Sequence, residues 1–405
     1  MTAHDVVPVN AANRFAHIDA LRAFAVMLVV LAHAGLSAII PGGSGVTIFF
    51  SISGFIITFL VLREKDKTGG FSITGFYTRR FLKIAPPLLM IVGIPTLIYA
   101  LGHELDWGAV LAQFFFVFNW FEIDGVSTVL PGSGVVWSLA IEEQFYIVFA
   151  LFWLFGARFR HWRLILALCA GATVIASTSV RLVFAASPLL SERIYFGTDT
   201  RLDAIAWGVL AALGYHTWLA RGQKGGRLST VLASDWMLLG AILLYLLSLL
   251  IRDDWFRDSM RFTIQSLATC AVILYGQLPG RGPVRRVFYA VSVFRPVALI
   301  GLASYSIYLV HYIVADAVRP WFAGLPAAAS YLLIVALGVG AGIVSYLWLE
   351  VPLHRLYKRY AGRARPRAGK ATGLQTVQSS SMPGSAAVAQ PATDRAPWSR
   401  GVDPS

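Results

Sequence analysis

Apolar runs about as long as a lipid bilayer is thick recur along this sequence until roughly residue 350. A helix needs about 20 predominantly apolar residues to cross the hydrocarbon core. Only 14% of the 405 residues are charged, against about 25% in soluble domains. The sequence therefore predicts an all-α, polytopic integral membrane protein with about ten transmembrane helices. We expect these helices at 20–40, 45–62, 84–102, 135–155, 163–185, 204–220, 235–251, 262–278, 297–317 and 329–350.

The net charge of +13 could suit a nucleic-acid partner, but its distribution along the chain indicates membrane topology instead. Residues 63–83 are rich in Lys and Arg, whereas residues 103–134 contain neither and carry four carboxylates. This alternation follows the positive-inside rule, with both termini in the cytoplasm and no nucleic-acid partner. We therefore expect a cytoplasmic N-terminal segment at 1–14 and a transmembrane domain at 15–360. The tail at 361–405 is polar and lacks hydrophobic periodicity, so we expect it to be disordered and cytoplasmic.

Arg22 and His33 stand at the two ends of the apolar segment RAFAVMLVVLAH in the first predicted span. Eleven steps of about 100° place both side chains on one helix face, roughly 16 Å apart along the axis. An ionisable side chain inside a span is a functional candidate because charge in hydrocarbon is costly. Two plainer interpretations stay open. Arg22 would anchor the helix at the cytoplasmic surface with Asp19 as its partner, and His33 would bond a backbone carbonyl.

A second set of ionisable residues lies in the later spans. His33, Glu143 and His311 are expected about 10, 12 and 9 Å from the outer ends of their helices. Glu142 and Glu143 point about 100° apart, so only one of them can easily face a given cavity. A neutral imidazole is a natural general base near neutral pH, and a carboxylate can orient it. The sequence thus predicts a polar chamber suited to proton transfer, although a polar helix–helix contact would also explain Glu143. The other predicted members of this chamber are Glu142, Tyr146, Arg201 and Asp203.

A basic cluster is expected at the cytoplasmic face, where Arg22 joins Arg79, Arg80 and Lys83. Arginine binds phosphate through two hydrogen bonds, so this cluster suits a phosphorylated ligand. A phosphorylated donor together with a base deeper in the membrane indicates acyl or phosphoryl transfer. Phosphoryl transfer is disfavoured because the cytoplasmic side has no carboxylate cluster of the kind that binds Mg²⁺. No metal site is expected, and no G-x-S-x-G motif supports an acyl-serine intermediate.

Six ordered segments resemble the membrane acyltransferase 3 family, and the resemblance covers about residues 15–357. The first segment, HIDALRAFAVMLVVLAH, is similar to the family's Arg-x10-His first helix. In the segment RRFLKIAPP at 79–87, Lys83 replaces the later arginine of the family pattern. The remaining segments are GVTIFFSISGFIIT at 45–58, RRFLKIAPP at 79–87, WSLAIEEQFYIV at 137–148, TRLDAIAWGVLAA at 200–212, and GLASYSIYLVH at 301–311 followed by LEVP at 349–352.

The resemblance implies an enzyme that takes an acyl group, usually acetyl, from cytoplasmic acyl-CoA. The acceptor would be a hydroxyl of a carbohydrate or of a glycosylated lipid or metabolite. His33 would be the catalytic histidine with Arg22 as its partner, and Glu143 and Tyr146 would be the polar residues of the fourth segment. Ala140 stands where the family often has serine, so a supporting hydroxyl near Glu143 is missing. The residues that would lie at the CoA entrance are Arg79, Arg80 and Lys83.

We expect a multi-pass protein of the bacterial inner membrane that O-acetylates a cell-surface or exported polysaccharide. Many relatives carry a C-terminal hydrolase-like domain, so this chain would act alone or pass the acyl group to a separate periplasmic acceptor protein. One alternative keeps the chemistry but changes the acceptor to a small glycosylated metabolite, such as a macrolide or lipo-oligosaccharide. Another is a proton-coupled transporter that uses the same ionisable residues. Transporters tend to show two related halves, and this sequence shows no such symmetry.

Overall fold

The computed structural model describes residues 15–125, 127–223 and 226–363. The predicted N-terminal segment at 1–14 and most of the predicted tail, 364–405, lie outside the described residues. The chain divides into a compact unit, Met1–Lys358, and a second unit, Arg359–Ser405. Of the second unit the structure describes only the end of helix α18 (Val351–Arg363).

The described residues are helical and contain no β-strand, which confirms the all-α class. The remaining α-helices are α1 (Ala16–Leu31), α2 (Gly42–Thr68), α3 (Ile73–Leu88), α4 (Ile94–Tyr99), α5 (Trp107–Phe114), α6 (Phe118–Asp124), α7 (Trp137–Phe155), α8 (Trp162–Phe184), α9 (Ser191–Phe196), α10 (Thr198–Ala220), α11 (Arg227–Leu232), α12 (Asp235–Leu250), α13 (Asp254–Asp258), α14 (Arg261–Gln277), α15 (Pro283–Val293), α16 (Arg295–Val318) and α17 (Ala327–Ser345). Three π-helical turns, η1 (Ala32–Leu36), η2 (Leu89–Gly93) and η7 (Tyr346–Glu350), continue α1, α3 and α17. Short 3₁₀ turns are η3 (Ser133–Val136), η4 (Gly156–Arg158), η5 (Pro188–Leu190) and η6 (Arg319–Phe322).

All ten predicted spans are helical, and seven continuous helices among the described residues are long and apolar enough to cross a membrane. These seven are Ala16–Leu36, Gly42–Thr68, Ile73–Tyr99, Ser133–Arg158, Trp162–Phe184, Arg295–Phe322 and Ala327–Tyr357. Of the other three predicted spans, α10 has 23 residues but contains Arg201, Asp203 and His216. Helices α12 and α14 are shorter, with 16 and 17 residues. The count of about ten spans and the cytoplasmic termini therefore stay predictions.

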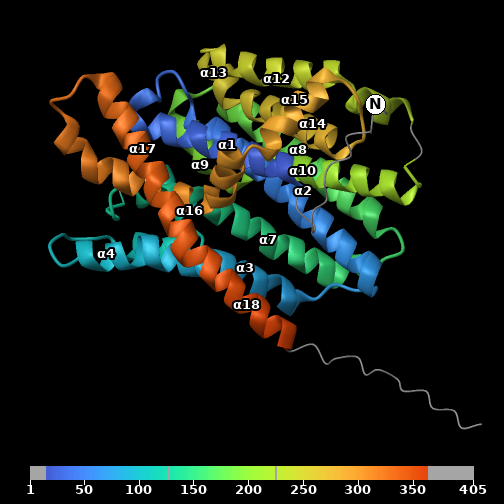
Figure 1. Cartoon of the computed structure of the whole chain (residues 1–405), viewed down its shortest axis with the longest axis horizontal. Helices are drawn as coiled ribbons and strands as arrows, with labels where there is room; N and C mark the ends of the chain where they lie inside the picture. Colours follow the sequence, from blue (N-terminus) through green and yellow to red (C-terminus); the bar gives the residue numbers. More distant parts are fainter. Residues whose placement is uncertain (1–14, 126, 224–225, 364–405) are drawn as a thin grey trace, which may run out of the picture. The chain divides into compact units, whose positions relative to one another are not determined.

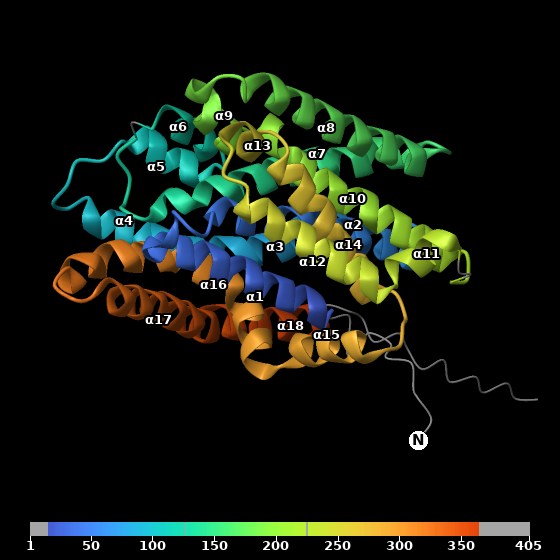
Figure 2. The same cartoon turned by 90° about the horizontal axis from the view of Figure 1, so that it is seen from above.

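Glycines let the central helices approach one another closely. Helix α1 packs against α2 and α16, and α2 packs against α10; Figures 1 and 2 both show α1 beside α16. A Cβ on Gly54 of α2 would overlap the carbonyl of Ile205 on α10, and one on Gly208 would overlap the carbonyl of Ser51. Gly301 of α16 meets the carbonyl of Asp19 on α1 in the same way. Small residues at such crossings are typical of helices that associate inside a bilayer.

Helix α3 carries the predicted basic cluster, and its sequence explains where it starts and where its regular geometry ends. The Ser72 side chain accepts a hydrogen bond of 3.1 Å from the Gly75 backbone N–H and caps the helix. Pro86 and Pro87 lie inside the last turn and contribute no backbone N–H. The wider turn η2 follows directly, so α3 presents its basic residues on a regular helical segment that ends just beyond them.

Candidate functional site: a basic cavity and a histidine pair

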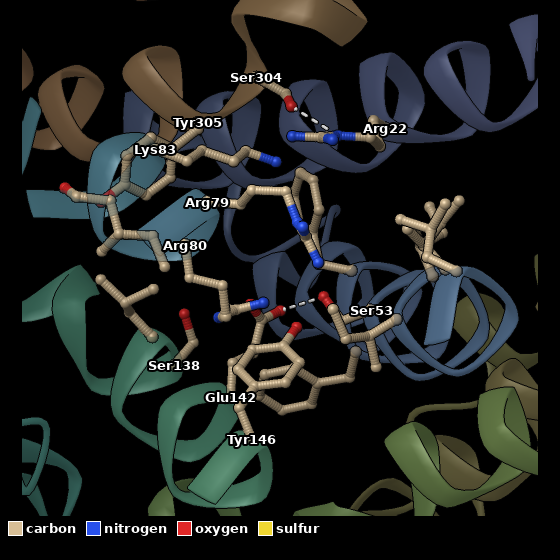
Figure 3. A pocket seen from close by; sticks show the side chains of 18 of the residues that line it. Arg22, Ser53, Arg79, Arg80, Lys83, Ser138, Glu142, Tyr146, Ser304 and Tyr305 are labelled. Carbon is tan, nitrogen blue, oxygen red and sulfur yellow. Dashed lines mark hydrogen bonds between the residues drawn. The ribbon is translucent and has the colours of Figure 1, made fainter. Parts of the chain in front are cut away.

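A cavity of about 300 Å³ lies among α1, α2, α3, α7 and α16, and polar side chains line one part of it (Figure 3). Its volume is at the lower end of the usual range for small-molecule sites, about 300–1,000 Å³. Apolar side chains of α2 and α3, such as Ile56 and Phe76, line the rest. The polar lining residues are Arg22, Ser53, Glu64, Arg79, Arg80, Lys83, Ser138, Glu142, Tyr146, Ser304, Tyr305 and Tyr308.

Three cationic groups face the same space in this cavity. Figure 3 shows the Lys83 ammonium beside the guanidinium groups of Arg22 and Arg79. Arg22 Nε donates a hydrogen bond of 3.0 Å to the neutral Ser304 hydroxyl, and neither Arg22 nor Lys83 makes an ion pair within the described residues. Like charges held close together repel one another. The arrangement is therefore suited to an anion, and phosphate is the anion that arginine binds with the best geometry.

Arg80 differs from Arg22 and Lys83 because a carboxylate neutralises it. Its Nη2 lies 2.5 Å from Glu143 Oε1, and its guanidinium carbon lies 3.2 Å from the centre of the Tyr146 ring. Glu142 points elsewhere and accepts a hydrogen bond of 2.8 Å from the Ser53 hydroxyl. Glu142 lines the cavity and Glu143 does not, so the structure places one of the two adjacent carboxylates in this space.

His33 and His311 form a hydrogen-bonded pair, with 3.0 Å between His33 Nδ1 and His311 Nε2. His311 Nδ1 lies 2.8 Å from the Tyr308 carbonyl oxygen, which can only accept, so His311 carries its proton on Nδ1. His311 Nε2 is then an acceptor, and His33 Nδ1–H must donate to it. The remaining lone pair of the couple is on His33 Nε2, which is the arrangement that a general base requires.

The backbone around His33 departs from a regular α-helix. His33 lies in the π-helical turn η1, and such turns are frequent at functional sites. Gly35 ends the turn with φ of 125°, a conformation that favours glycine, and a Cβ there would overlap the Tyr331 ring. Arg319 Nη2 donates a hydrogen bond of 2.8 Å to the His33 carbonyl oxygen. The half-buried His33 ring stacks on Tyr312 with 4.3 Å between ring centres.

The histidine pair does not line the cavity, but one residue links the two. Tyr308 lines the cavity, and its backbone carbonyl holds His311. Its hydroxyl lies 2.7 Å from Ser138 Oγ and donates to the Val135 carbonyl at 3.0 Å, while Phe49 packs edge-on against its ring. Arg22 therefore lies in the cavity and His33 in the turn η1, so the basic cluster and the histidine pair occupy separate places along the first helix.

Two other predicted members of the chamber lie in a buried network outside the cavity lining. Both Asp203 carboxylate oxygens lie 2.7 Å from Arg181 guanidinium nitrogens, and Asp203 also accepts from Thr263. Arg201 donates to the Tyr195 carbonyl and to Thr47, and its guanidinium carbon lies 3.9 Å from the centre of the Phe262 ring. These contacts join α2, α8, α9, α10 and α14, so they hold helices together.

Sequence reasoning passed over several residues that the structure brings to these sites. Ser53, Ser138 and Ser304 carry no distinct sequence signal, since small polar side chains are common where membrane helices cross. Gly35 directly after Ala34 was the available signal that the helix ends beside His33. The described residues contain no group of three or more His, Cys, Asp or Glu that could hold a metal ion. The other residues passed over are Glu64, Tyr305, Tyr308, Tyr312 and Arg319.

The seven long apolar helices fit a multi-pass membrane protein, and its described residues enclose a basic cavity. A family model described as an acyltransferase domain matches residues 15–349, and the chain belongs to this acyltransferase 3 family. It is 27% identical over 354 residues to O-acetyltransferase OatA of Staphylococcus aureus (strain NCTC 8325 / PS 47). It is 30% identical over 364 residues to a protein of Staphylococcus aureus (strain COL) that is provisionally named as an O-acetyltransferase. Both matches cover 84% of this chain but only 57% of the relative's length. No solved structure matches the chain.

Proposed function

We propose that this protein is an O-acyltransferase that takes an acyl group, most simply acetyl, from acyl-CoA. The observation that carries this proposal is the convergence of Arg22, Arg79 and Lys83 on one cavity with a single carboxylate, Glu64, paired to one of them. CoA carries phosphates that such a cluster would hold, and the apolar lining on α2 and α3 suits the uncharged arm that ends in the thioester. The basic cluster is predicted to lie on the cytoplasmic side, which supports donor entry from that side.

His33 Nε2 is the base of the proposed reaction. It accepts the proton of the acceptor hydroxyl while the hydroxyl oxygen bonds to the thioester carbonyl carbon. The carbon–sulfur bond then breaks, and the proton on His33 passes to the leaving thiolate. His311 fixes the His33 tautomer throughout, because its Nε2 continues to accept from His33 Nδ1–H. The thioester reaches His33 past Phe49 and Tyr308, so displacement of these two rings is part of the proposal.

The proposed acceptor is a cell-surface or exported polysaccharide of a bacterium, modified at the inner membrane. The half-buried position of His33 at the far end of α1 from Arg22 supports an acceptor that arrives from the outer side. The names of the staphylococcal relatives support transfer of acetyl to oxygen. Mass spectrometry of polysaccharide and of secreted metabolites from a deletion strain would distinguish this acceptor from a small glycosylated metabolite.

The first test is His33→Ala in intact cells, with acceptor acetylation as the readout. We expect acetylation to fall at least about 100-fold, since general-base catalysis contributes about 10²–10⁴-fold. His103→Ala is the matched control, because His103 is exposed and stacks on Tyr99 away from both sites. Unchanged acetylation in the His33 variant would remove its catalytic role. Failure of the purified wild type to bind acyl-CoA would favour the transporter alternative.

A further inference from the structure

Of the two carboxylates that line the cavity among the described residues, Glu64 and Glu142, Glu64 forms an ion pair with one of the cations. Glu64 on α2 and Arg79 on α3 both line it, and Glu64 Oε2 lies 2.9 Å from Arg79 Nη2. The pair is accessible to solvent, since 22% of the Glu64 side chain and 51% of the Arg79 side chain are exposed. Exposed pairs of this kind are weak and are easily exchanged for another partner.

The two partners are not held equally. The second carboxylate oxygen of Glu64 accepts a hydrogen bond of 3.0 Å from the Ser72 backbone N–H, at the start of α3. Glu64 is therefore fixed by the main chain whether or not Arg79 is beside it. Arg79 is held through one Nη2 contact at the end of a long, exposed side chain, so Arg79 is the member of the pair that can move.

The Glu64–Arg79 pair differs from the Glu143–Arg80 pair in where its carboxylate lies. Arg80 is largely buried, stacks on Tyr146 and is neutralised by Glu143 outside the cavity lining. Glu64 itself lines the cavity, so its charge acts on any anion that enters the space beside Arg79. A phosphate that binds Arg79 through two nitrogens must take over the nitrogen that Glu64 now occupies.

We propose that Glu64 competes with the donor's phosphate for Arg79 and so sets how tightly the cavity holds CoA. This inference rests on the proposed function, because it assigns the CoA phosphate as the competing anion. Glu64 weakens donor binding by retaining Arg79 and by repelling the incoming phosphate. It also favours release of the CoA product, since the Arg79 guanidinium has a fixed partner to return to.

The test is the dissociation constant of CoA for the purified, full-length protein and its variants in detergent. Glu64→Gln removes the charge but keeps an oxygen that can accept from the Ser72 N–H. We expect it to tighten CoA binding about two- to fivefold at low salt, the range that exposed ion pairs support. The gain should shrink between about 0.01 M and about 1 M NaCl, where the Debye length falls from about 30 Å to about 3 Å.

Two further variants make the result specific. Asp199→Asn breaks the exposed Arg193–Asp199 pair, which has the same 2.7–2.9 Å geometry outside the cavity, and should leave CoA binding unchanged. In an Arg79→Gln background, Glu64→Gln should change the dissociation constant by less than about twofold, because most of the exposed-pair effect passes through Arg79.

Each outcome supports the inference or overturns it. Unchanged or weaker CoA binding by Glu64→Gln, with normal binding by the wild type, would overturn the competition and leave the proposed function standing. A full gain in the Arg79→Gln background would overturn the role of Arg79 as the contested group. Absence of CoA binding by the wild type would overturn the proposed function and this inference together.

Discussion

Glu142 and Glu143 are neighbours in the sequence but meet different chemical surroundings in the folded chain. Glu142 faces the cavity and Ser53, whereas Glu143 faces Arg80. The roughly 100° turn between successive residues made a division predictable, but not which carboxylate faces which way. That choice depends on how α7 is rotated against α2 and α3, and a single sequence does not contain this information. Arg22 is a similar case. A helix anchor at the cytoplasmic surface and a functional residue have the same sequence pattern, and they differ only in which groups lie opposite the side chain.

Glu122 provides a pH dependence at the residue scale. It lies on α6, outside the seven candidate spans, where burial and the Glu192 carboxylate raise its pKa from 4.5 to about 7. The folded protein therefore binds this proton more tightly than the unfolded chain, so the stabilisation is complete below pH 4.5 and is lost as the pH rises through 7. Glu122→Gln stays neutral and should lose less thermal stability than the wild type between about pH 5 and about pH 8.

Unfolding temperatures in detergent at the two pH values would check this prediction. Asp124→Asn, an exposed carboxylate of the same helix, is the control and should keep the wild-type pH dependence. Equal losses in the Glu122 variant and the wild type would contradict the assignment.

At the scale of an element, α1 and the turn η1 join the two sites. Arg22 lies on the regular part of the helix, and His33 lies in the wider π-helical turn that ends at Gly35. The apolar run at 20–40 predicted this helix, because the length of such a run depends only on which residues are apolar. It did not predict the change of geometry at Ala32, since a π-helical turn is selected by its neighbours, among them Tyr331 and Arg319.

Gly35→Ala tests the importance of that turn. A non-glycine residue at φ of 125° is strained, and such strain costs about 1–3 kcal/mol. The added Cβ also overlaps the Tyr331 ring. We expect His33 to shift from His311 and acceptor acetylation to fall at least tenfold, while the purified protein still binds CoA.

Gly102→Ala is the matched control, because nothing lies within 4 Å of a Cβ there and its φ is not positive. Wild-type acetylation by the Gly35 variant would show that the turn geometry is not needed for activity.

At the scale of the whole molecule, a buried ion pair joins three helices. Arg181 of α8 and Asp203 of α10 are both fully buried, and Thr263 of α14 completes their hydrogen bonding. The sequence marked Asp203 as a member of a polar chamber because it is a charge in an apolar setting, and the structure places it in a buried ion pair with Arg181. The sequence could not distinguish a substrate-binding chamber from a buried ion pair that holds helices together, because both depend on a partner residue that is distant in the sequence.

Asp203→Asn should destabilise the protein strongly. Removing one member of a buried ion pair leaves the other charge uncompensated and costs about 3–5 kcal/mol. The unfolding temperature in detergent should fall by far more than for Asp199→Asn, whose pair with Arg193 is exposed and is worth at most about 1 kcal/mol. Equal effects of the two substitutions would show that Arg181 finds another partner.

Arg22 and His33 share one continuous stretch of helix, and this limits how the chain can change in length. Inserting or deleting one residue between them would rotate His33 by about 100° relative to Arg22 and move it about 1.5 Å along the axis. Either the Arg22–Ser304 contact or the His33–His311 contact could then form, but not both, because Ser304 and His311 are themselves fixed on α16. We therefore expect length variation to be tolerated in the connections between helices and excluded from these eleven steps, which a library of single-residue insertions would measure.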